Sequence, residues 1–215
     1  AAHFGFVSAV TFIAAQQFGE RSGQAPEGVL VALVVALEIP AILLGLTLAK
    51  RDAGLQWHQV REVLVGKTAL LLIGGMVIGA IATKHGTDAV NLMYGQLFQG
   101  TLMLFMLDMG MVAAAQLRGI GRGAFRLVAY GIALPLLHGI IGTALGHLAG
   151  LSPAGAAVFG TMTASASYIA APASVRASLP EANVGRCITA ALGITFPFNL
   201  AIGIPMYFAF AAWLG

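Results

Sequence analysis

Residues 163–173 read TASASYIAAPA, and residues 5–15 read GFVSAVTFIAA. Both stretches combine small residues with hydroxyl side chains inside an apolar chain, and they align on Ser165 and Ser8. Small-residue composition alone produces an occasional match of this kind. The alignment therefore needs support from the sequence on its flanks.

That support comes from a second pair of matching stretches further along the chain. Residues 38–46 read EIPAILLGL, and residues 196–204 read FPFNLAIGI. Pro40 and Pro197 each stand 32 positions after the aligned serine of their own copy. Two matches in the same order and at the same spacing indicate an internal repeat.

The composition places both copies in a membrane. Of the 215 residues, 59% are hydrophobic and 9% are charged, whereas about 25% of a soluble domain is charged. Such a chain cannot cover a water-facing surface, which excludes a soluble enzyme, a nucleic-acid binder and a disordered chain. The single cysteine, Cys187, excludes an intramolecular disulfide and a cysteine-cluster metal site.

Seven apolar stretches predict the membrane spans, since a spanning helix needs about 20 mostly apolar residues. They are 2–18, 28–49, 68–83, 95–117, 127–149, 154–175 and 187–214. The third is short for a span, and Pro172 breaks the sixth. The predicted fold class is an all-α, polytopic transmembrane helical protein.

The basic residues predict the orientation of these spans. Three loops on one side of the membrane hold nine of the 11 Lys and Arg residues, and the opposite loops hold only Arg21 and Lys84. By the positive-inside rule the richly basic side is cytoplasmic. Ala1 therefore starts inside, and Gly215 ends outside.

The two repeat copies begin five spans apart, so they cross the membrane in opposite directions, as in many secondary transporters. Three spans precede the matched pair in the second copy, which leads us to expect three equivalents before Ala1 in a five-plus-five architecture. Residues 1–49 are then the last two spans of the first repeat, 50–67 a cytoplasmic linker, and 68–215 the second repeat. A natural fragment, a misplaced start and a shortened chain would each account for this.

The serine-rich stretches have what a binding site at the membrane midplane requires. Broken helices leave backbone N–H groups free at half-helix N-termini, whose positive dipole ends favour anions. The hydroxyls of Ser8, Thr11, Ser165 and Ser167 can orient a ligand there. Ordinary helix packing is the alternative explanation for small residues, but their symmetric placement in the repeat favours a site.

Two carboxylates, Glu38 and Asp108, lie inside predicted spans. An ionised carboxylate in hydrocarbon costs roughly 2.5–3.5 kcal/mol, so it normally faces a cavity or a partner. With no Lys or Arg in a span, the partners are a cation, a proton or a helix N-terminus. Glu38 stands just before Pro40, where we expect the helix to be interrupted; for Asp108, capping or snorkelling at the cytoplasmic edge is an equal alternative. The predicted cation-binding residues are Thr11, Glu38, Asp108, Thr195 and Asn199.

Other patterns indicate packing and no enzymatic chemistry. Gly142, Gly146 and Gly150 form one small-residue ridge, and Gly75 with Gly79 forms another; both are typical of close helix contacts. The chain has no phosphate loop, zinc motif or nucleophile elbow, and no nucleophile paired with a base. The sequence therefore favours a protein that is not an enzyme and that uses no metal beyond a coupling cation.

These stretches resemble a known family. GFVSAVTF, EIPAILL, LDMGM, ASASYIAAPASVRASLPEAN and ITFPFNLAIGIP are similar to the bacterial sodium-dependent bicarbonate transporter family, and the resemblance covers essentially the whole chain. The family fold has ten spans in two inverted repeats of five. The resemblance implies a multi-pass protein of the bacterial cytoplasmic membrane that takes up bicarbonate, with sodium as the coupling ion and no other cofactor.

The resemblance also implies a site and partners. Bicarbonate would lie between the two crossing segments, with sodium nearby. The implied substrate-binding residues are Gly5, Phe6, Val7, Ser8, Ala9, Ser165, Ala166, Ser167 and Tyr168. Family members can form trimers, and some are inhibited by a small nucleotide-binding signalling protein at the cytoplasmic face. A homotrimer and such a partner are therefore expected, and a nucleic acid is not.

Three positions depart from the family pattern. Tyr168 stands where the well-studied members carry Asp, Phe6 stands where a small residue is expected, and those members lack Asp108. The departures leave open a transporter of another small anion or carboxylate. A truncated, non-transporting membrane domain that only assembles or binds a partner is the other alternative.

Overall fold

A computed structural model describes residues 7–49, 57, 61, 65, 67–82, 86, 88, 90, 92–118, 125–168 and 183–215. Throughout these residues the regular structure is helical and contains no strand. The α-helices are α1 (Ala9–Arg21), α2 (Val29–Ala49), α4 (Lys67–Ile81), α6 (Leu97–Arg118), α7 (Phe125–Leu148), α8 (Pro153–Ala164), α10 (Val184–Ile188), α11 (Phe196–Phe198) and α12 (Ile204–Leu214). The predicted all-α fold class is confirmed.

Within the described ranges, three helical runs are long and apolar enough to cross a membrane. They are Leu97–Arg118, Phe125–Leu148 and Val184–Leu214, and they match the fourth, fifth and seventh predicted spans. The helices α1, α2 and α4 fall on the first three predicted spans. The sixth predicted span begins as α8 and leaves the helical conformation at Ser165.

The run Val184–Leu214 alternates between α-helix and π-helical turns. Turns of π-helix at Thr189–Thr195 and Asn199–Gly203 come just before the segments that contain Pro197 and Pro205. A proline has no N–H to donate to the preceding turn, and a wider π turn accommodates that loss without ending the helix. The run therefore stays continuous where Thr195 and Asn199 lie.

The interruption expected at Pro40 is wrong. The helix α2 is continuous from Val29 to Ala49 with Pro40 inside it, as α7 is continuous through Pro135. A proline removes one backbone hydrogen bond and bends a helix, and membrane helices tolerate this where neighbouring groups satisfy the freed carbonyl. Proline alone therefore did not locate the helix break.

The closest helix contact is that of α7 with α8. A Cβ added at Gly142 would lie 3.0 Å from the Gly160 Cα, and one at Gly146 would lie 3.0 Å from the Ala156 Cα. The predicted ridge is thus confirmed at Gly142 and Gly146. At Gly150 it is wrong, because that residue has a φ of +83° and forms the turn after α7.

The second glycine ridge does not pack against the described part of the chain. A Cβ added at Gly75 or at Gly79 on α4 would meet nothing within 4 Å. Spacing alone predicted a contact there, but a contact also needs a neighbouring helix. Among the residues that the structure describes, α4 therefore has no partner at these two glycines.

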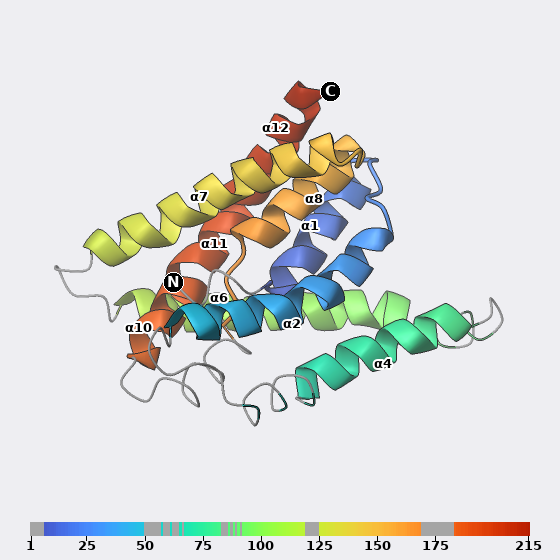
Figure 1. Cartoon of the computed structure of the whole chain (residues 1–215), viewed down its shortest axis with the longest axis horizontal. Coiled ribbons are helices and arrows are strands. Elements are labelled where there is room, and N and C mark those ends of the chain that lie inside the picture. Colours follow the sequence, from blue (N-terminus) through green and yellow to red (C-terminus); the bar gives the residue numbers. More distant parts are fainter. Residues whose placement is uncertain are drawn as a thin grey trace.

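The helix α8 occupies the middle of the apolar core. It packs against α7, α12 and α1, and Figure 1 shows these helices running alongside one another. Phe12 from α1, Leu30 from α2, Met162 from α8 and Tyr207 from α12 meet in one buried cluster. The core therefore holds the C-terminal end of α8 in place against the N-terminal end of α1.

Candidate binding site

The two serines on which the repeat aligns meet in space. The backbone N–H of Ser8 donates a hydrogen bond to the Ser165 Oγ at 2.8 Å, across 157 positions of the chain. Ser8 is the extended residue just before α1, and Ser165 is the extended residue just after α8. We call this meeting point, formed by Ser8 to Thr11 and Ser165 to Tyr168, the junction.

Ser8 caps the N-terminus of α1. Its Oγ accepts hydrogen bonds from the Thr11 N–H at 3.4 Å and from the Thr11 Oγ1 at 3.0 Å, and its carbonyl accepts from the Phe12 N–H at 2.9 Å. The first N–H groups of a helix have no acceptor within the helix. Because the N–H groups of Thr11 and Phe12 donate to Ser8, the N–H groups of Ala9 and Val10 are the ones without a helical acceptor. The positive end of α1 therefore lies at the junction.

Ser165 closes the C-terminus of α8. Its Oγ donates to the Met162 carbonyl at 2.7 Å, and the Asn199 Nδ2 donates to the Ala164 carbonyl at 2.9 Å. The C-terminal carbonyls of a helix carry its negative dipole end. The junction thus brings a positive helix end, suited to an anion, beside a negative helix end, suited to a cation.

Tyr168 lies at the side of the junction. Its ring packs edge-on against Phe196, with ring centroids 5.5 Å apart and an interplanar angle of 68°. The Tyr168 hydroxyl lies beside the Ser8 side chain, but the geometry does not make a hydrogen bond. That hydroxyl is buried and has no partner among the described residues. Ala166 and Ser167, between Ser165 and Tyr168, are both buried.

Thr195 is held by a backbone carbonyl that Pro135 leaves without its helical hydrogen bond. Because Pro135 lacks an N–H, the carbonyl of Gly131 one turn earlier has no helical donor, and the Thr195 Oγ1 donates to it at 2.7 Å. The Thr195 side chain is 1% exposed. Its proton is committed to α7, which leaves its oxygen lone pairs for another partner.

Asn199 joins its own helical run to α8 and is fully buried. Its Nδ2 donates to the end of α8, and its Oδ1 lies 3.4 Å from the Tyr207 hydroxyl. The single Tyr207 proton has a nearer acceptor in the Pro135 carbonyl at 3.0 Å. The Asn199 Oδ1 therefore keeps acceptor capacity at the C-terminal end of α8.

The remaining predicted site residues include some that the structure describes and some that it does not. Val7 and Ala9 belong to the first turn around Ser8, where Val7 is half-buried and Ala9 exposed. Asp108 is exposed on α6. Gly5 and Phe6 lie outside the described residues, and the side chain of Glu38 lies outside the described side chains.

Sequence reasoning missed Tyr207, although a signal was present. Tyr207 stands eight positions after Asn199, about two helical turns, which places both side chains on one face. Gly139 on α7 makes room for it, because a Cβ there would overlap the Tyr207 ring. The phenol thereby fixes Asn199 at the end of α8.

Sequence reasoning also missed Glu27, which anchors the opposite end of α8. The Glu27 Oε1 accepts a hydrogen bond from the Ser152 N–H at 2.6 Å, just before α8 begins. Burial by itself would raise the pKa of this carboxyl, but hydrogen bonds from the Ser152 N–H, its own backbone N–H and the Ser152 hydroxyl hold the pKa below its usual value. The available signal was a Pro-Glu pair that occurs in the loop of each repeat copy, as Pro26-Glu27 and as Pro180-Glu181.

Comparison with known protein families assigns the chain to one of them. A family model described as the Na+-dependent bicarbonate transporter superfamily matches residues 1–212. The chain belongs to this superfamily. A search of curated proteins found no match. The family match confirms the resemblance, and with the apolar helical runs it identifies a membrane protein of a transporter superfamily.

The oxygen groups at the junction fit a small hard cation. Among the described residues no group of three or more His, Cys, Asp or Glu side chains could hold a metal ion. The available ligands are hydroxyl, amide and carbonyl oxygens, which alkali and alkaline-earth cations accept and softer transition metals do not favour. In a member of the bicarbonate transporter superfamily, that chemistry suits sodium.

Proposed function

We propose that this protein takes up bicarbonate across the bacterial cytoplasmic membrane with sodium, and that both ligands bind at the junction of α1 and α8. The hydrogen bond between the Ser8 N–H and the Ser165 Oγ is the observation that carries the proposal. It brings two helix ends of opposite dipole together in the middle of the core. Transport follows from movement of the helices around the bound ligands and needs no chemical change.

The anion binds at the N-terminal end of α1. Backbone N–H groups of Ala9 and Val10 point along the helix axis beyond its first turn, and the hydroxyls of Ser8 and Tyr168 lie beside them. The described Lys and Arg residues stand at helix ends and in loops. The binding free energy therefore comes from backbone dipoles and hydroxyls, which suits a small anion that is held weakly enough to be released.

Sodium binds at the C-terminal end of α8. Asn199 supplies a carbonyl oxygen there, Thr195 and Thr11 supply buried hydroxyl oxygens, and Glu38 on α2 remains part of the proposed set. Asp108 is not used in the proposal, because it is exposed on α6. Each ion lowers the electrostatic cost of placing the other nearby, so sodium raises bicarbonate affinity and bicarbonate raises sodium affinity by the same factor.

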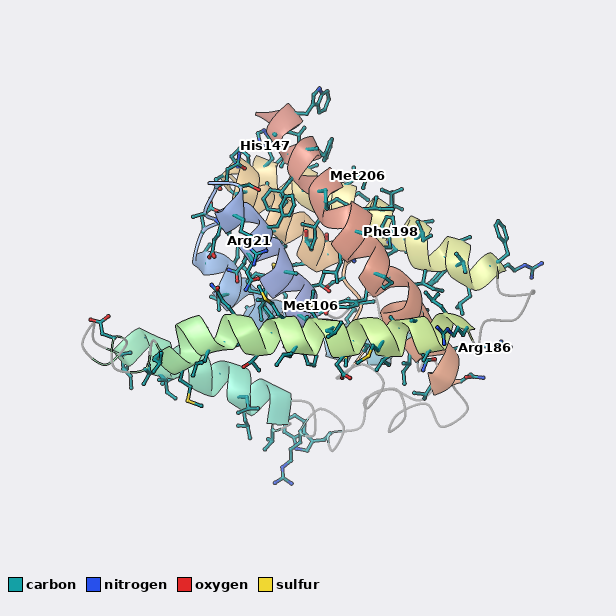
Figure 2. All side chains as sticks on the ribbon, turned by 180° about the vertical axis from the view of Figure 1, so that it is seen from behind. Arg21, Met106, His147, Arg186, Phe198 and Met206 are labelled. Atoms are coloured by element: carbon teal, nitrogen blue, oxygen red, sulfur yellow. The ribbon has the colours of Figure 1, made fainter. Side chains whose placement is uncertain are left out.

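The proposed orientation follows the charge asymmetry of the loops. Ala1 lies on the cytoplasmic side, and Gly215 lies outside. Figure 2 supports this, because Arg186 lies near one end of the Val184–Leu214 run and His147 near the other. A homotrimer and inhibition by a small cytoplasmic signalling protein remain part of the proposal on the strength of the family.

Uptake of labelled bicarbonate into proteoliposomes tests the proposal. We expect saturable uptake with sodium outside and background uptake with potassium outside. Equal uptake in both salts would contradict sodium coupling. Uptake of a different labelled anion, with no bicarbonate uptake in correctly inserted protein, would contradict bicarbonate as the substrate.

A second candidate keeps the fold and changes the solute to another small oxyanion, such as formate, acetate or nitrate. The hydroxyl of Tyr168 favours it, since a phenol donates to any oxyanion and does not distinguish bicarbonate by charge. Competition by each anion against labelled bicarbonate separates the two candidates. A competitor that inhibits at lower concentration than unlabelled bicarbonate would identify the better substrate.

A further inference from the structure

The geometry points to Tyr168 as the residue that selects the anion, with its hydroxyl donating a hydrogen bond to one oxygen of a small oxyanion. The inference rests on the proposed function, because it assumes that the junction binds the transported anion. It goes further in naming the side chain that selects the oxyanion and the hydrogen bond by which it does so. Three observations on the hydroxyl groups of the junction carry the argument.

The first observation concerns Ser8. A hydroxyl has one proton to donate and two lone pairs that accept. Both lone pairs of the Ser8 Oγ are occupied, by the Thr11 N–H and by the Thr11 Oγ1. Ser8 therefore cannot accept a further hydrogen bond, and the Tyr168 hydroxyl beside it cannot donate to it.

The second observation concerns Ser165, the other hydroxyl of the central contact. Its proton goes to the Met162 carbonyl, and it accepts the Ser8 N–H. The hydroxyls of Ser8 and Ser165 are thus held in place by the caps of α1 and α8. Even if Ser8 turned its proton toward Tyr168, the proton of Tyr168 would remain without an acceptor in this set.

The third observation concerns the confinement of Tyr168 itself. Its ring is held edge-on by Phe196 and packs against the buried cluster of Ala166 and Ala191. The hydroxyl is buried without a partner among the residues that the structure describes. Native proteins rarely leave a buried hydroxyl unpaired because the cost is substantial, so such a group calls for a ligand.

These hydrogen bonds determine that the missing partner of the Tyr168 hydroxyl is an acceptor. Once these hydrogen bonds are made, the proton of the Tyr168 hydroxyl is left without an acceptor. The adjacent N-terminal end of α1 also presents donors. A ligand that satisfies both must offer lone pairs in more than one direction. A small oxyanion does so through separate oxygens, with one oxygen at the α1 N-terminus and another at the Tyr168 hydroxyl.

The variant Tyr168→Phe tests the inference, because it removes the hydroxyl and keeps the ring against Phe196. With the full chain in proteoliposomes, we expect the bicarbonate KM to rise about tenfold, as for the loss of one hydrogen bond to a charged group. The maximal rate and the sodium half-saturation at saturating bicarbonate should stay unchanged. The melting temperature should stay equal or rise, since an unpaired buried hydroxyl has been removed.

The control is Tyr130→Phe, which removes a tyrosine hydroxyl from the exposed face of α7 and should leave the KM unchanged. A lower melting temperature for Tyr168→Phe with an unchanged KM would overturn the inference, because it would show a hydroxyl with a structural partner. An equal rise in KM for both variants would overturn it as well.

Failure of the proposed function is distinguishable from failure of this inference. If the unsubstituted protein takes up no bicarbonate, the melting temperature of both proteins is measured in bicarbonate, formate, acetate, nitrate and chloride. An oxyanion that stabilises the unsubstituted protein more than Tyr168→Phe would support the inference with a different substrate. Equal stabilisation of the two proteins by every anion, or stabilisation by none, would overturn it.

Discussion

The Thr195 Oγ1 donates to the Gly131 carbonyl at 2.7 Å, and that carbonyl is the one that Pro135 leaves without a helical donor. The same hydrogen bond explains how α7 can contain a proline without leaving the Gly131 carbonyl unpaired. It also fixes a hydroxyl next to the proposed sodium site. A proline on one helix thus determines the orientation of a side chain on another.

Substitution of Thr195 by Val should destabilise the protein by about 1–3 kcal/mol, because the buried Gly131 carbonyl loses the donor that replaces its helical N–H. In a Pro135→Ala background the helical N–H is restored, so the same substitution should cost less. Thermal or denaturant unfolding of the four proteins of this double-mutant cycle measures the coupling. Additive effects of the two substitutions would show that the hydroxyl does not replace the missing N–H.

Substitution of Gly139 by Ala should be strongly destabilising, by about 1–3 kcal/mol, because the new methyl group would overlap the buried Tyr207 ring. Gly79→Ala on α4 is the matched control, since a Cβ there meets nothing within 4 Å and Ala favours a helix. Melting temperatures in detergent compare the two variants. Similar behaviour of both would argue against close packing of α12 on α7.

Replacement of Ser165 and Ser167 together by Ala should abolish ligand binding at the junction, because the Ser8 N–H loses its acceptor and the hydroxyls at the end of α8 are removed. We expect sodium-dependent bicarbonate uptake to fall to background while the protein still inserts and stays folded. Ser22→Ala is the control, since its exposed hydroxyl bonds only within the end of α1. Unchanged affinity in the double variant would remove these hydroxyls from the site.

Substitution of Glu27 by Gln should lower stability by about 1 kcal/mol at pH 7, because a charged cap at the N-terminus of α8 is lost. The pKa of Glu27 is lower in the folded protein than its ordinary value of 4.5. The contribution of this charge is therefore fully present above pH 4.5 and disappears as the pH falls through the folded pKa.

Unfolding of the two proteins as a function of pH measures this effect. The difference in melting temperature should be constant near neutral pH and should shrink in acid, and added salt should reduce it because the carboxylate is partly exposed. Glu20→Gln, which removes an exposed carboxylate near the end of α1, controls for the loss of one negative charge from the protein. A difference that grows as the pH falls would contradict a lowered pKa.

Much of the fold could be predicted from local sequence. Apolar length located some helices to within a few residues, as Val29–Ala49 against the predicted 28–49 illustrates. It did not locate the junction, because α1 begins at Ala9 and α8 ends at Ala164, well inside the predicted spans 2–18 and 154–175. The repeat alignment also pointed to Ser8 and Ser165 together, because symmetry relates their positions without any knowledge of side-chain contacts. Proline, by contrast, predicted a break in α2 that does not occur, since a single missing N–H is not enough to end a membrane helix.

The candidate site could be predicted only in part. The serines were found from their placement in the repeat and Tyr168 from the family resemblance, whereas the contribution of Tyr207 depends on its partner Asn199 and on the space at Gly139. Asp108 was singled out because a charge in a span is costly. The structure leaves it exposed on α6, and its distance from the junction could not be derived from its depth along one helix.

The sequence by itself determined that this is an α-helical membrane protein with an internal repeat, because apolar length and residue spacing are properties of the chain alone. Only the tertiary structure decided which hydrogen-bonding groups remain unpaired when the helices pack. Thr195 is committed to α7, Asn199 to α8, and Ser8 to Thr11, while the Tyr168 hydroxyl is left without a partner among the described residues. Whether a polar group is satisfied depends on neighbours brought together from distant parts of the chain, and no local pattern contains that information.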